Sequence, residues 1–385
     1  MAEKTGTGKE DKEAGQQERV IYWIPLRGFL KKKGGADMTK QEGSSGKALE
    51  MALRGSMRYV LVAVISVLLC LLPWSSAISA EKPFVIKLAH VHVPEHPTAI
   101  GCLQFKKLIE ERSKGRVKIE VYPGSQLGSE RELFEAAMMG TVEMGAISSS
   151  VIASFTRESG IWDLPFLFRD SGHAYRVMDG PIAEKVNGIA LNKTGVRFIG
   201  YFENGWRHMT NKVRPINKPE DLNGLKIRSM TAPVIMEAIR SLGANPVPIA
   251  WGEVYLALQQ GVADGQENPH VNTYGAKLYE VQKYVSLTGH VYTAHVLCIN
   301  DKFYKSLPDD IQKLIVTTGK EVIDQARETA QALNSDFLKK LVEKGMIVNT
   351  PPDLAPFRAK GKVVYEKFAP QVGGMSLINE IINTK

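Results

Sequence analysis

After residue 82, segments with the hydrophobic pattern of a strand alternate with segments that have the period of a helix. Residues 84–91 (FVIKLAHV) form an apolar run typical of a strand, and residues 116–123 (RVKIEVYP) alternate apolar and polar positions with a strand's period of two. Residues 98–113 between them have the period of a helix. The side chains expected on the buried face of that helix are Ile100, Leu103, Phe105, Leu108 and Ile109. Residues 130–140 then predict a helix that ends at a glycine, and residues 142–149 predict another strand.

The second half of the chain repeats this alternation. Strands are predicted over residues 224–230 and 245–249, and helices over residues 232–242 and 251–260. This β-α-β order predicts an α/β fold, with parallel sheets covered by helices on both faces. Residues 290–300 (HVYTAHVLCIN) predict a long strand that can cross between two lobes.

A very long helical pattern follows near the C-terminal end. Residues 309–345 keep the helical period well beyond the usual helix length, with two aspartates at the start and a glycine at the end. One long helix and two shorter ones both fit this pattern.

Residues 246–269 (PVPIAWGEVYLALQQGVADGQENP) combine an extended segment, a helix, a turn and a polar end. Gly261 is a natural stop for the helix, and Asp264–Gly265 predicts a turn. The polar residues that follow are expected to form a loop, in which Pro269 favours an extended backbone at Asn268. Such a segment can hold hydrogen-bonding side chains in place, or it can simply close a domain.

The N-terminal part has the anatomy of an export signal. Residues 51–80 contain basic residues, the apolar run 60–72 and a small-residue ending, so we expect a signal peptide cleaved after residue 77 or 80. The apolar run is short for the ~20 residues that span a bilayer, although a retained anchor is the alternative. Residues 1–50 are rich in glycine, lysine and glutamate and are expected to be disordered, or to precede a true start at Met51.

The distribution of charge argues against nucleic acid as a partner, and the cysteines are expected to be buried. The formal net charge is +8, but residues 1–58 carry twelve basic and eight acidic residues, so half of the excess lies there. Without residues 1–80 the chain has 305 residues, which are enough for two lobes and have no basic stripe that would favour nucleic acid as a partner. Cys102 and Cys298 lie in apolar segments, so we expect both to be buried as small hydrophobic side chains. The sequence does not decide whether they form a disulfide with each other.

Six long motifs carry a resemblance to a known family. They are VYPGSQLGSERELFEAAMMGTVEMG, DLPFLFRD, NGWRHMTN, DLNGLKIRSM, GANPVPIAWGEVYLALQQGVADGQENP and YEVQKYVSLTGH. In this order they resemble the solute-binding proteins of TRAP transporters, of the DctP type. The resemblance covers residues 84–385. It implies a periplasmic-binding-protein-like fold with two lobes, a ligand cleft between them and a long helix spanning both.

The resemblance implies four ligand-binding residues on the second lobe. Arg228, in LNGLKIRSM, matches the arginine that binds the ligand carboxylate, and a planar guanidinium suits that role because it offers two parallel N–H donors. Arg207 matches a second polar contact, with a surface arginine as the alternative. Asn268 matches a ligand-binding amide, and Trp251 matches an aromatic residue over the ligand, with core packing as its alternative.

The match on the first lobe is weaker. His90 and Ser148 each follow a predicted strand and are the candidates there. Some sialic-acid binders of the family place a carboxylate near Ser148, and the serines found here argue against sialic acid. Tyr201, Glu203 and Asn204 are further candidates for the cleft.

The resemblance also implies location, partners and domain limits. The chain is expected in the periplasm, as a monomer without a cofactor that delivers an organic acid to a sodium-coupled permease of two membrane subunits. We expect lobe I to contain residues 81–204 and 294–333, and lobe II to contain residues 205–293 and 334–385. A solute-binding protein of an ABC system is the nearest alternative, and a ligand sensor is another.

The sequence gives little support for a catalytic site or a metal site. A secreted bilobal enzyme would need a nucleophile–base pair, and no GxSxG motif is present. His90, His92 and His96 suggest a zinc site at first sight, but we expect the chain to turn before His96, and no HExxH or CxxC motif accompanies them. We therefore predict neither a metal site nor catalysis.

Overall fold

The computed structural model describes residues 57, 60–64, 66 and 82–385. The contacts between residues divide the chain into two units, residues 1–78 and residues 79–385. The fold described below is that of the second unit. The predicted extension over residues 1–50 lies outside the described residues, as does the predicted signal peptide except for 57, 60–64 and 66. Among the described helices, none has the length and apolar character needed to cross a membrane.

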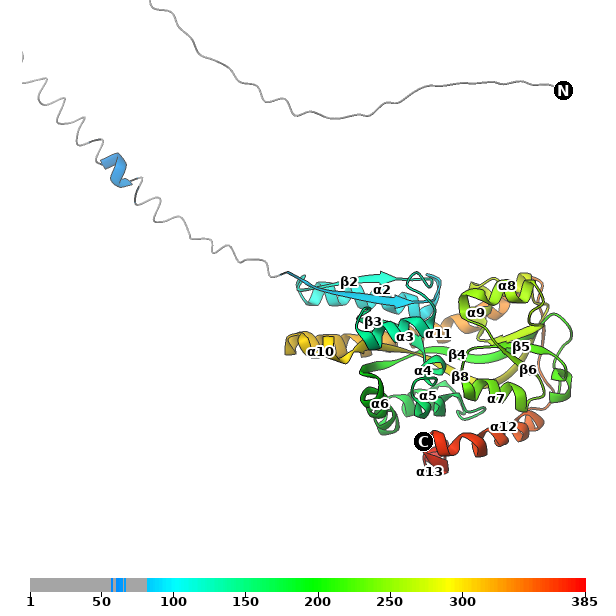
Figure 1. The fold of residues 1–385 in the computed structure, drawn as a ribbon. Coiled ribbons are helices and arrows are strands. Elements are labelled where there is room, and N and C mark those ends of the chain that lie inside the picture. The colour runs from blue at the N-terminus through cyan, green and yellow to red at the C-terminus, as the bar shows by residue number, and fades with distance from the viewer. Residues whose placement is uncertain (1–56, 58–59, 65, 67–81) are drawn as a thin grey trace, which may run out of the picture. The chain divides into compact units, whose positions relative to one another are not determined.

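A mixed sheet of nine strands forms the middle of residues 82–385 (Figure 1). The strand order is β2-β1-β3-β8-β4-β7-β5-β6, with β9 beside β8. The bounds are β1 Phe84–His90, β2 Val117–Tyr122, β3 Met144–Ser148, β4 Val196–Asn211, β5 Lys226–Ser229, β6 Asn245–Pro248, β7 Gly265–Asn268, β8 Tyr284–Asn300 and β9 Ile347–Asn349. Strands β1–β3 pair in parallel, and so do β5–β7, whereas β4 and β8 run antiparallel between the two groups.

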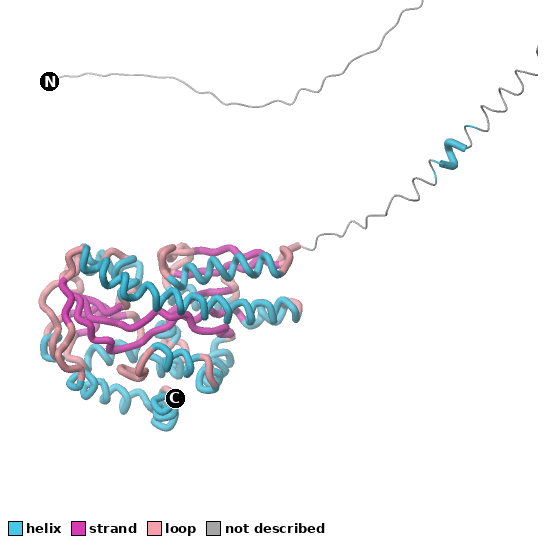
Figure 2. The backbone as a smooth tube through the Cα atoms, turned by 180° about the vertical axis from the view of Figure 1, so that it is seen from behind, coloured by secondary structure: helices cyan, strands magenta, loops and turns pink. Residues whose placement is uncertain are grey.

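Helices cover both faces of the sheet, as the alternating pattern predicted (Figures 1 and 2). Their bounds are α2 Pro97–Arg112, α3 Glu130–Met139, α4 Ser149–Ile152, α5 Ser171–Met178, α6 Pro181–Thr194, α7 Pro233–Ser241, α8 Val254–Gln259, α9 His270–Gly275, α10 Asp301–Ser306, α11 Asp309–Glu343, α12 Ala355–Phe368 and α13 Gly374–Asn383. Successive residues of a strand pack into hydrophobic cores on opposite faces of the sheet. Leu88 packs in the core of α2 and α11, while the neighbouring Ala89 packs with α3, α5 and α6.

Residues 309–343 form one helix, α11, of 35 residues. It lies along the sheet against β4, and it contacts α2 in the first half of the chain and α9 in the second. Of the two possibilities left by the sequence, the single long helix is therefore the one found.

The long strands β4 and β8 connect the two parallel groups. β8 pairs with β9 at Tyr284–Ser286 and with β3 at residues 295–299, so one strand serves both halves, as its long β pattern predicted. The pairing of β4 with β8 shifts register three times, and one of these bulges lies at Gly205. Gly205 has φ +116°, a backbone conformation that residues with a Cβ rarely adopt.

The predicted buried face of α2 is partly wrong. Phe105 and Ile109 are fully buried, but Ile100 and Leu103 are 38% and 50% exposed. Small residues occupy the buried face because α2 packs very close to the sheet: a Cβ added to Gly101 would lie 2.7 Å from a carbon of the Phe202 ring.

The polar loop predicted after Gly265 is a strand. Residues 265–268 form β7, which pairs with β4 and β5 in the interior of the sheet, and all four residues are buried. Their polar side chains suggested a solvent-exposed loop, but here they hydrogen-bond to other buried side chains.

The two cysteines of the described residues are free and buried, as small hydrophobes are. Cys102 packs in the core on one face of the sheet and Cys298 in the core on the other face. The sheet therefore separates the two thiols and leaves the disulfide unformed.

Candidate ligand-binding site

A small cavity lies where the two halves of the fold meet. Its walls come from the ends of β1, β3 and β5, from β4, β7 and β8, and from the short 3-10 helix Trp251–Glu253. The lining residues are Val91, His92, Glu130, Ser148, Asn204, Arg207, Arg228, Met230, Trp251, Asn268, Asn272 and His295. The volume of the cavity is about 20 Å³, which is room for about one water molecule.

Arg228 is a buried cation without an acidic partner. It lies on β5 and is 1% exposed, and both Nε and Nη2 donate to the Ile249 carbonyl oxygen, at 2.9 and 2.7 Å. Nη1 has no hydrogen-bond partner among the described residues. Burial lowers the pKa of Arg228 to about 10, so the guanidinium stays charged at neutral pH. A charge held in this way needs an anion, and the cavity is where one can enter.

Arg207 is fully buried, which excludes the surface position considered from the sequence. It lies on β4 and is paired with Glu267 of β7, to which Nη2 donates at 2.9 Å. Burial raises the pKa of Glu267, but the charge of Arg207, the hydrogen bonds that Arg207 donates and the His290 ring 3.5 Å away outweigh that effect and hold the pKa at about 2. Because Arg207 is paired with Glu267, Arg228 is the arginine of the site that forms no ion pair with the described residues.

A chain of amides crosses the cavity wall. Asn272 Nδ2 donates to Asn268 Oδ1 at 3.0 Å and to Asn204 Oδ1 at 2.8 Å. Asn204 Nδ2 donates in turn to Thr293 Oγ1 at 3.1 Å, and Arg207 Nη1 donates to the same oxygen at 3.4 Å. The chain fixes the orientation of Asn268 and also links the two halves of the fold.

Two other predicted residues line the cavity. The half-buried ring of Trp251 lies beside Arg228, with the guanidinium carbon 5.7 Å from the ring centroid. Ser148 also lines the cavity, and its hydroxyl donates to Met230 Sδ at 3.6 Å. The structure therefore brings together Arg207, Arg228, Trp251, Asn268, Ser148 and Asn204, all predicted from the sequence.

Three further candidates lie outside this cavity. His90 is buried behind it, where its Nδ1 accepts from the backbone N–H of His92 at 3.2 Å. Glu203 is bonded to Gln331 of the long helix at 2.8 Å. Tyr201 lines a different cavity of about 500 Å³ between α6, β4 and α11. On β4, alternation puts Tyr201 and Glu203 on the side of the sheet opposite Asn204.

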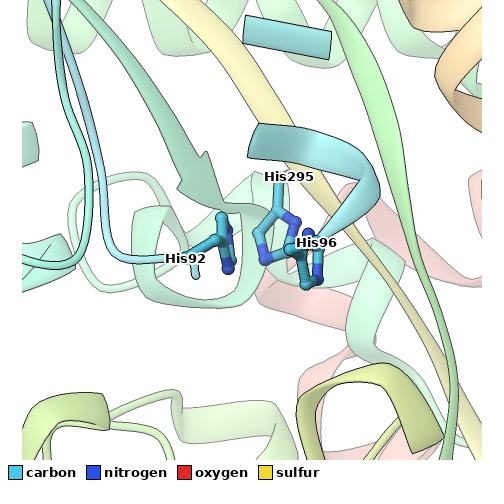
Figure 3. A group of neighbouring side chains, drawn as sticks. All are labelled: His92, His96 and His295. Atoms are coloured by element: carbon cyan, nitrogen blue, oxygen red, sulfur yellow. The ribbon is translucent and has the colours of Figure 1, made fainter. Parts of the chain in front are cut away.

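Three histidines converge beside the cavity, which the sequence pattern did not predict (Figure 3). The chain does turn after β1, but the turn returns His96 against His92, with ring centroids 4.1 Å apart. His295 comes from β8 and lies 4.1 Å from the His92 ring. The expectation that the turn would separate His96 from His92 is therefore wrong. Burial, the largest effect, lowers the pKa of all three imidazoles, that of His96 to about 3.

Glu130 is one of the lining residues that sequence reasoning missed, and Asn272 and His295 are others. Glu130 is the first residue of α3, and its Oε1 accepts from the Ser148 backbone N–H at 2.7 Å. A capping box formed by Ser129 and Glu132 starts the helix at this position, and that motif is the signal that locates Glu130. A carboxylate thus does lie beside Ser148, supplied by another element, so the serines alone do not argue against sialic acid.

Comparison with known proteins agrees with this geometry. Residues 88–371 match the family described as bacterial extracellular solute-binding protein, family 7 (DctP). Three similar solved structures are TRAP periplasmic solute-binding proteins, and each alignment covers 78% of this chain and 99% of the other. The protein from Bordetella bronchispeptica is 35% identical with a TM-score of 0.75, and it contains density assigned to pantoate.

The other two structures contain different acids. The protein from Polaromonas sp. JS666 is 33% identical, has a TM-score of 0.76 and is bound to D-erythronate. The protein from Sulfurospirillum deleyianum is 32% identical, has a TM-score of 0.74 and contains succinate. This chain belongs to the DctP family of extracellular solute-binding proteins, and it has that family's two-lobed α/β fold.

Proposed function

We propose that this chain captures a small organic acid in the cavity and that Arg228 holds the acid's carboxylate. The observation that carries the proposal is the buried guanidinium beside the cavity, charged at neutral pH and without an acidic partner. A carboxylate placed there would accept charge-assisted hydrogen bonds and neutralise the buried charge. The acids named for the three similar structures all carry a carboxylate.

The other lining residues would orient the ligand. Asn268 offers an amide already fixed by its neighbours, and Arg207 adds donors beside the Glu267 carboxylate. Trp251 would cover an apolar face of the acid, and Ser148 would contact its far end. The protein would act by binding alone, without a cofactor and without catalysis.

Ligand entry requires the cavity to open. A cavity of about 20 Å³ is too small for an acid of several carbon atoms, so its two walls must move apart. The walls belong to the proposed lobe I (residues 81–204 and 294–333) and lobe II (residues 205–293 and 334–385). Hinge motion would bend the strands and the long helix that join the lobes, and contacts from both sides would favour the closed state.

The cellular role follows from membership of the family. The chain would be exported to the periplasm by its signal peptide and would act there as a monomer. It would deliver the acid to the membrane subunits of a TRAP permease, and a sodium gradient would drive uptake. Loss of uptake when sodium is removed, with ATP still present, is the expected result in cells that carry the matching permease.

A thermal-shift screen tests the binding proposal. The mature chain, residues 81–385, is mixed with organic acids and neutral sugars, each at high concentration. An acid at 1,000 times its dissociation constant adds about 4 kcal/mol to the free energy of unfolding, which raises the melting temperature by several degrees. We expect shifts with one class of acid and none with neutral sugars. Shifts with neutral sugars alone would contradict the proposal.

A further inference from the structure

The cavity wall contributed by the first half of the fold differs chemically from the Arg228 wall. We call it the first-half wall, and its residues are Val91, His92, Glu130, Ser148 and His295. Among the described lining residues, the lysines and arginines are Arg207 and Arg228, and neither belongs to this wall. A ligand held by Arg228 would therefore meet imidazole, hydroxyl and carboxyl groups at its other end.

Backbone hydrogen bonds fix the tautomers of two histidines near this wall, His90 and His96, whose rings do not line the cavity themselves. His96 caps α2, and its Nδ1 accepts from the Thr98 backbone N–H at 3.1 Å. Because a backbone N–H can only donate, the proton of neutral His96 lies on Nε2. His90 is fixed in the same tautomer by the N–H of His92. Nε2 of His92 and of His96 is buried and makes no hydrogen bond with the described residues.

The same geometry disfavours a metal ion. A metal ligand needs a bare nitrogen, but Nε2 of His96 carries its proton as long as Thr98 donates to Nδ1. The rings of His92 and His96 are also stacked, 16° from parallel, so their in-plane nitrogen directions run side by side. Zinc requires these directions to converge on one point about 2.0–2.1 Å from each nitrogen.

Glu130 adds an acceptor to the first-half wall. One of its oxygens is bonded to the Ser148 backbone, and Oε2 has no partner within the described part of the chain. Burial raises the pKa of Glu130, while the Ser148 hydrogen bond and the charges of Arg228 and Arg207 oppose that effect. When Glu130 is ionised, this oxygen accepts a hydroxyl hydrogen readily and repels a second carboxylate.

We propose that the first-half wall recognises hydroxyl groups, so that the preferred ligand is a hydroxylated monocarboxylic acid and not a dicarboxylic acid. The inference rests on the proposed function, because Arg228 must hold the first carboxylate. A hydroxyl group can pair with the buried Nε2 of His92 in either tautomer, because it both donates and accepts, and its hydrogen can also be accepted by Glu130. A second carboxylate would be desolvated beside Glu130 without a cation to pair with. An acid without hydroxyls would leave Nε2 of His92 unpaired.

Titration calorimetry with matched four-carbon acids tests this inference. The ligands are 2,3,4-trihydroxybutyrate, butyrate and succinate, added to the mature chain. We expect the trihydroxy acid to bind at least 100-fold more tightly than the other two. Succinate binding equally well or better would overturn the inference. If the screen selects longer acids, the hydroxylated and dicarboxylic acids of that length replace this set.

Two variants assign the selectivity to residues. Glu130→Gln keeps the shape and removes the charge, so the preference over succinate should fall at least tenfold. His92→Phe keeps a stacked ring and removes both nitrogens, so affinity for the hydroxylated acid should fall at least tenfold. Glu135→Gln, on the same helix but 42% exposed, is the control and should change neither value. Unchanged selectivity in both folded variants would overturn the inference.

The remaining outcomes separate this inference from the proposed function. Loss of all binding in Arg228→Ala, combined with no preference for hydroxyl groups, would overturn the inference alone. Full binding in Arg228→Ala would overturn the proposed function. Titration with zinc chloride covers the metal alternative, because one tightly held zinc ion per chain, absent from His92→Phe, would show that the imidazoles are metal ligands.

Discussion

At the scale of single residues, charge pairing decides what each arginine of the site can do. Arg207 and Arg228 lie on neighbouring parts of the sheet, and both are almost fully buried. Arg207 is satisfied by Glu267, whereas Arg228 is bonded only to a backbone carbonyl. The first is therefore a fixed part of the site, and the second is the residue that needs a ligand.

The Arg207–Glu267 pair makes a prediction about stability. Glu267→Ala leaves Arg207 buried without its partner, and breaking a buried pair in this way costs about 3–5 kcal/mol. Urea unfolding followed by circular dichroism measures this loss as a lower midpoint. Glu120→Ala, which removes an exposed partner of Lys118, is the control and should leave the midpoint unchanged. Equal midpoints for the two variants would contradict the assignment.

The residue scale also shows what sequence can and cannot reveal about the site. Arg228 and Asn268 were predictable because each lies in a long, specific motif. Glu130 also lies in such a motif, but neither it nor His295 was predicted, because the two reach the cavity from elements far apart in the chain, α3 and β8. Their contribution depends on how the strands are ordered in the sheet, and local patterns do not contain that order.

At the scale of elements, the packing of α2 makes a second prediction about stability. An alanine at position 101 places its Cβ 2.7 Å from the Phe202 ring and 3.3 Å from the Ala326 Cβ, so either the helix or the sheet must shift. Such overpacking costs about 1–3 kcal/mol. We expect Gly101→Ala to lower the midpoint of urea unfolding.

Gly188 of α6 is the matched control. A Cβ at that position meets nothing within 4 Å, so alanine gains helix propensity without a clash. Gly188→Ala should therefore stabilise the chain by about 0.5–1 kcal/mol. A Gly101→Ala variant as stable as Gly188→Ala would show that α2 does not pack closely on the sheet.

The hydrophobic pattern predicted the type of an element, helix or strand, correctly where one face of that element is apolar. The helical period gave α11, α3 and α7 close to their true bounds, and alternation gave β1 and β2. β7 was missed because its residues are polar and nonetheless buried on both faces. The pattern reports amphipathic faces, so a strand that carries the polar interior of a site looks like a loop.

At the scale of the whole molecule, buried histidines make stability depend on pH. Seven of the eight histidines have lowered pKa values, with burial as the main cause, among them His90 and His270 at about 4 and His96 at about 3. The unfolded chain takes up protons near pH 6.5, where the folded chain does not. The stability conferred by neutral histidines is therefore complete above pH 6.5 and is lost as the pH falls below it.

This difference predicts a large effect over a narrow pH range. Each buried histidine lowers the free energy of unfolding by about 1 kcal/mol between pH 7 and pH 5.5, so the total is several kcal/mol. Urea midpoints measured at pH 7.5, 6.5 and 5.5 should fall steadily. Equal midpoints at all three pH values would show that the histidines are accessible to protons in the folded state.

The measurement that tests the central claim most directly is titration calorimetry of the acid selected by the screen. We predict a dissociation constant at least tenfold higher for Arg228→Lys, because an ammonium group cannot reproduce two parallel N–H donors, and no measurable binding for Arg228→Ala. Arg240→Ala, which removes an exposed arginine on α7, should bind as the unaltered chain does. Binding of the acid to Arg228→Ala with unchanged affinity would contradict the claim that Arg228 holds the ligand carboxylate.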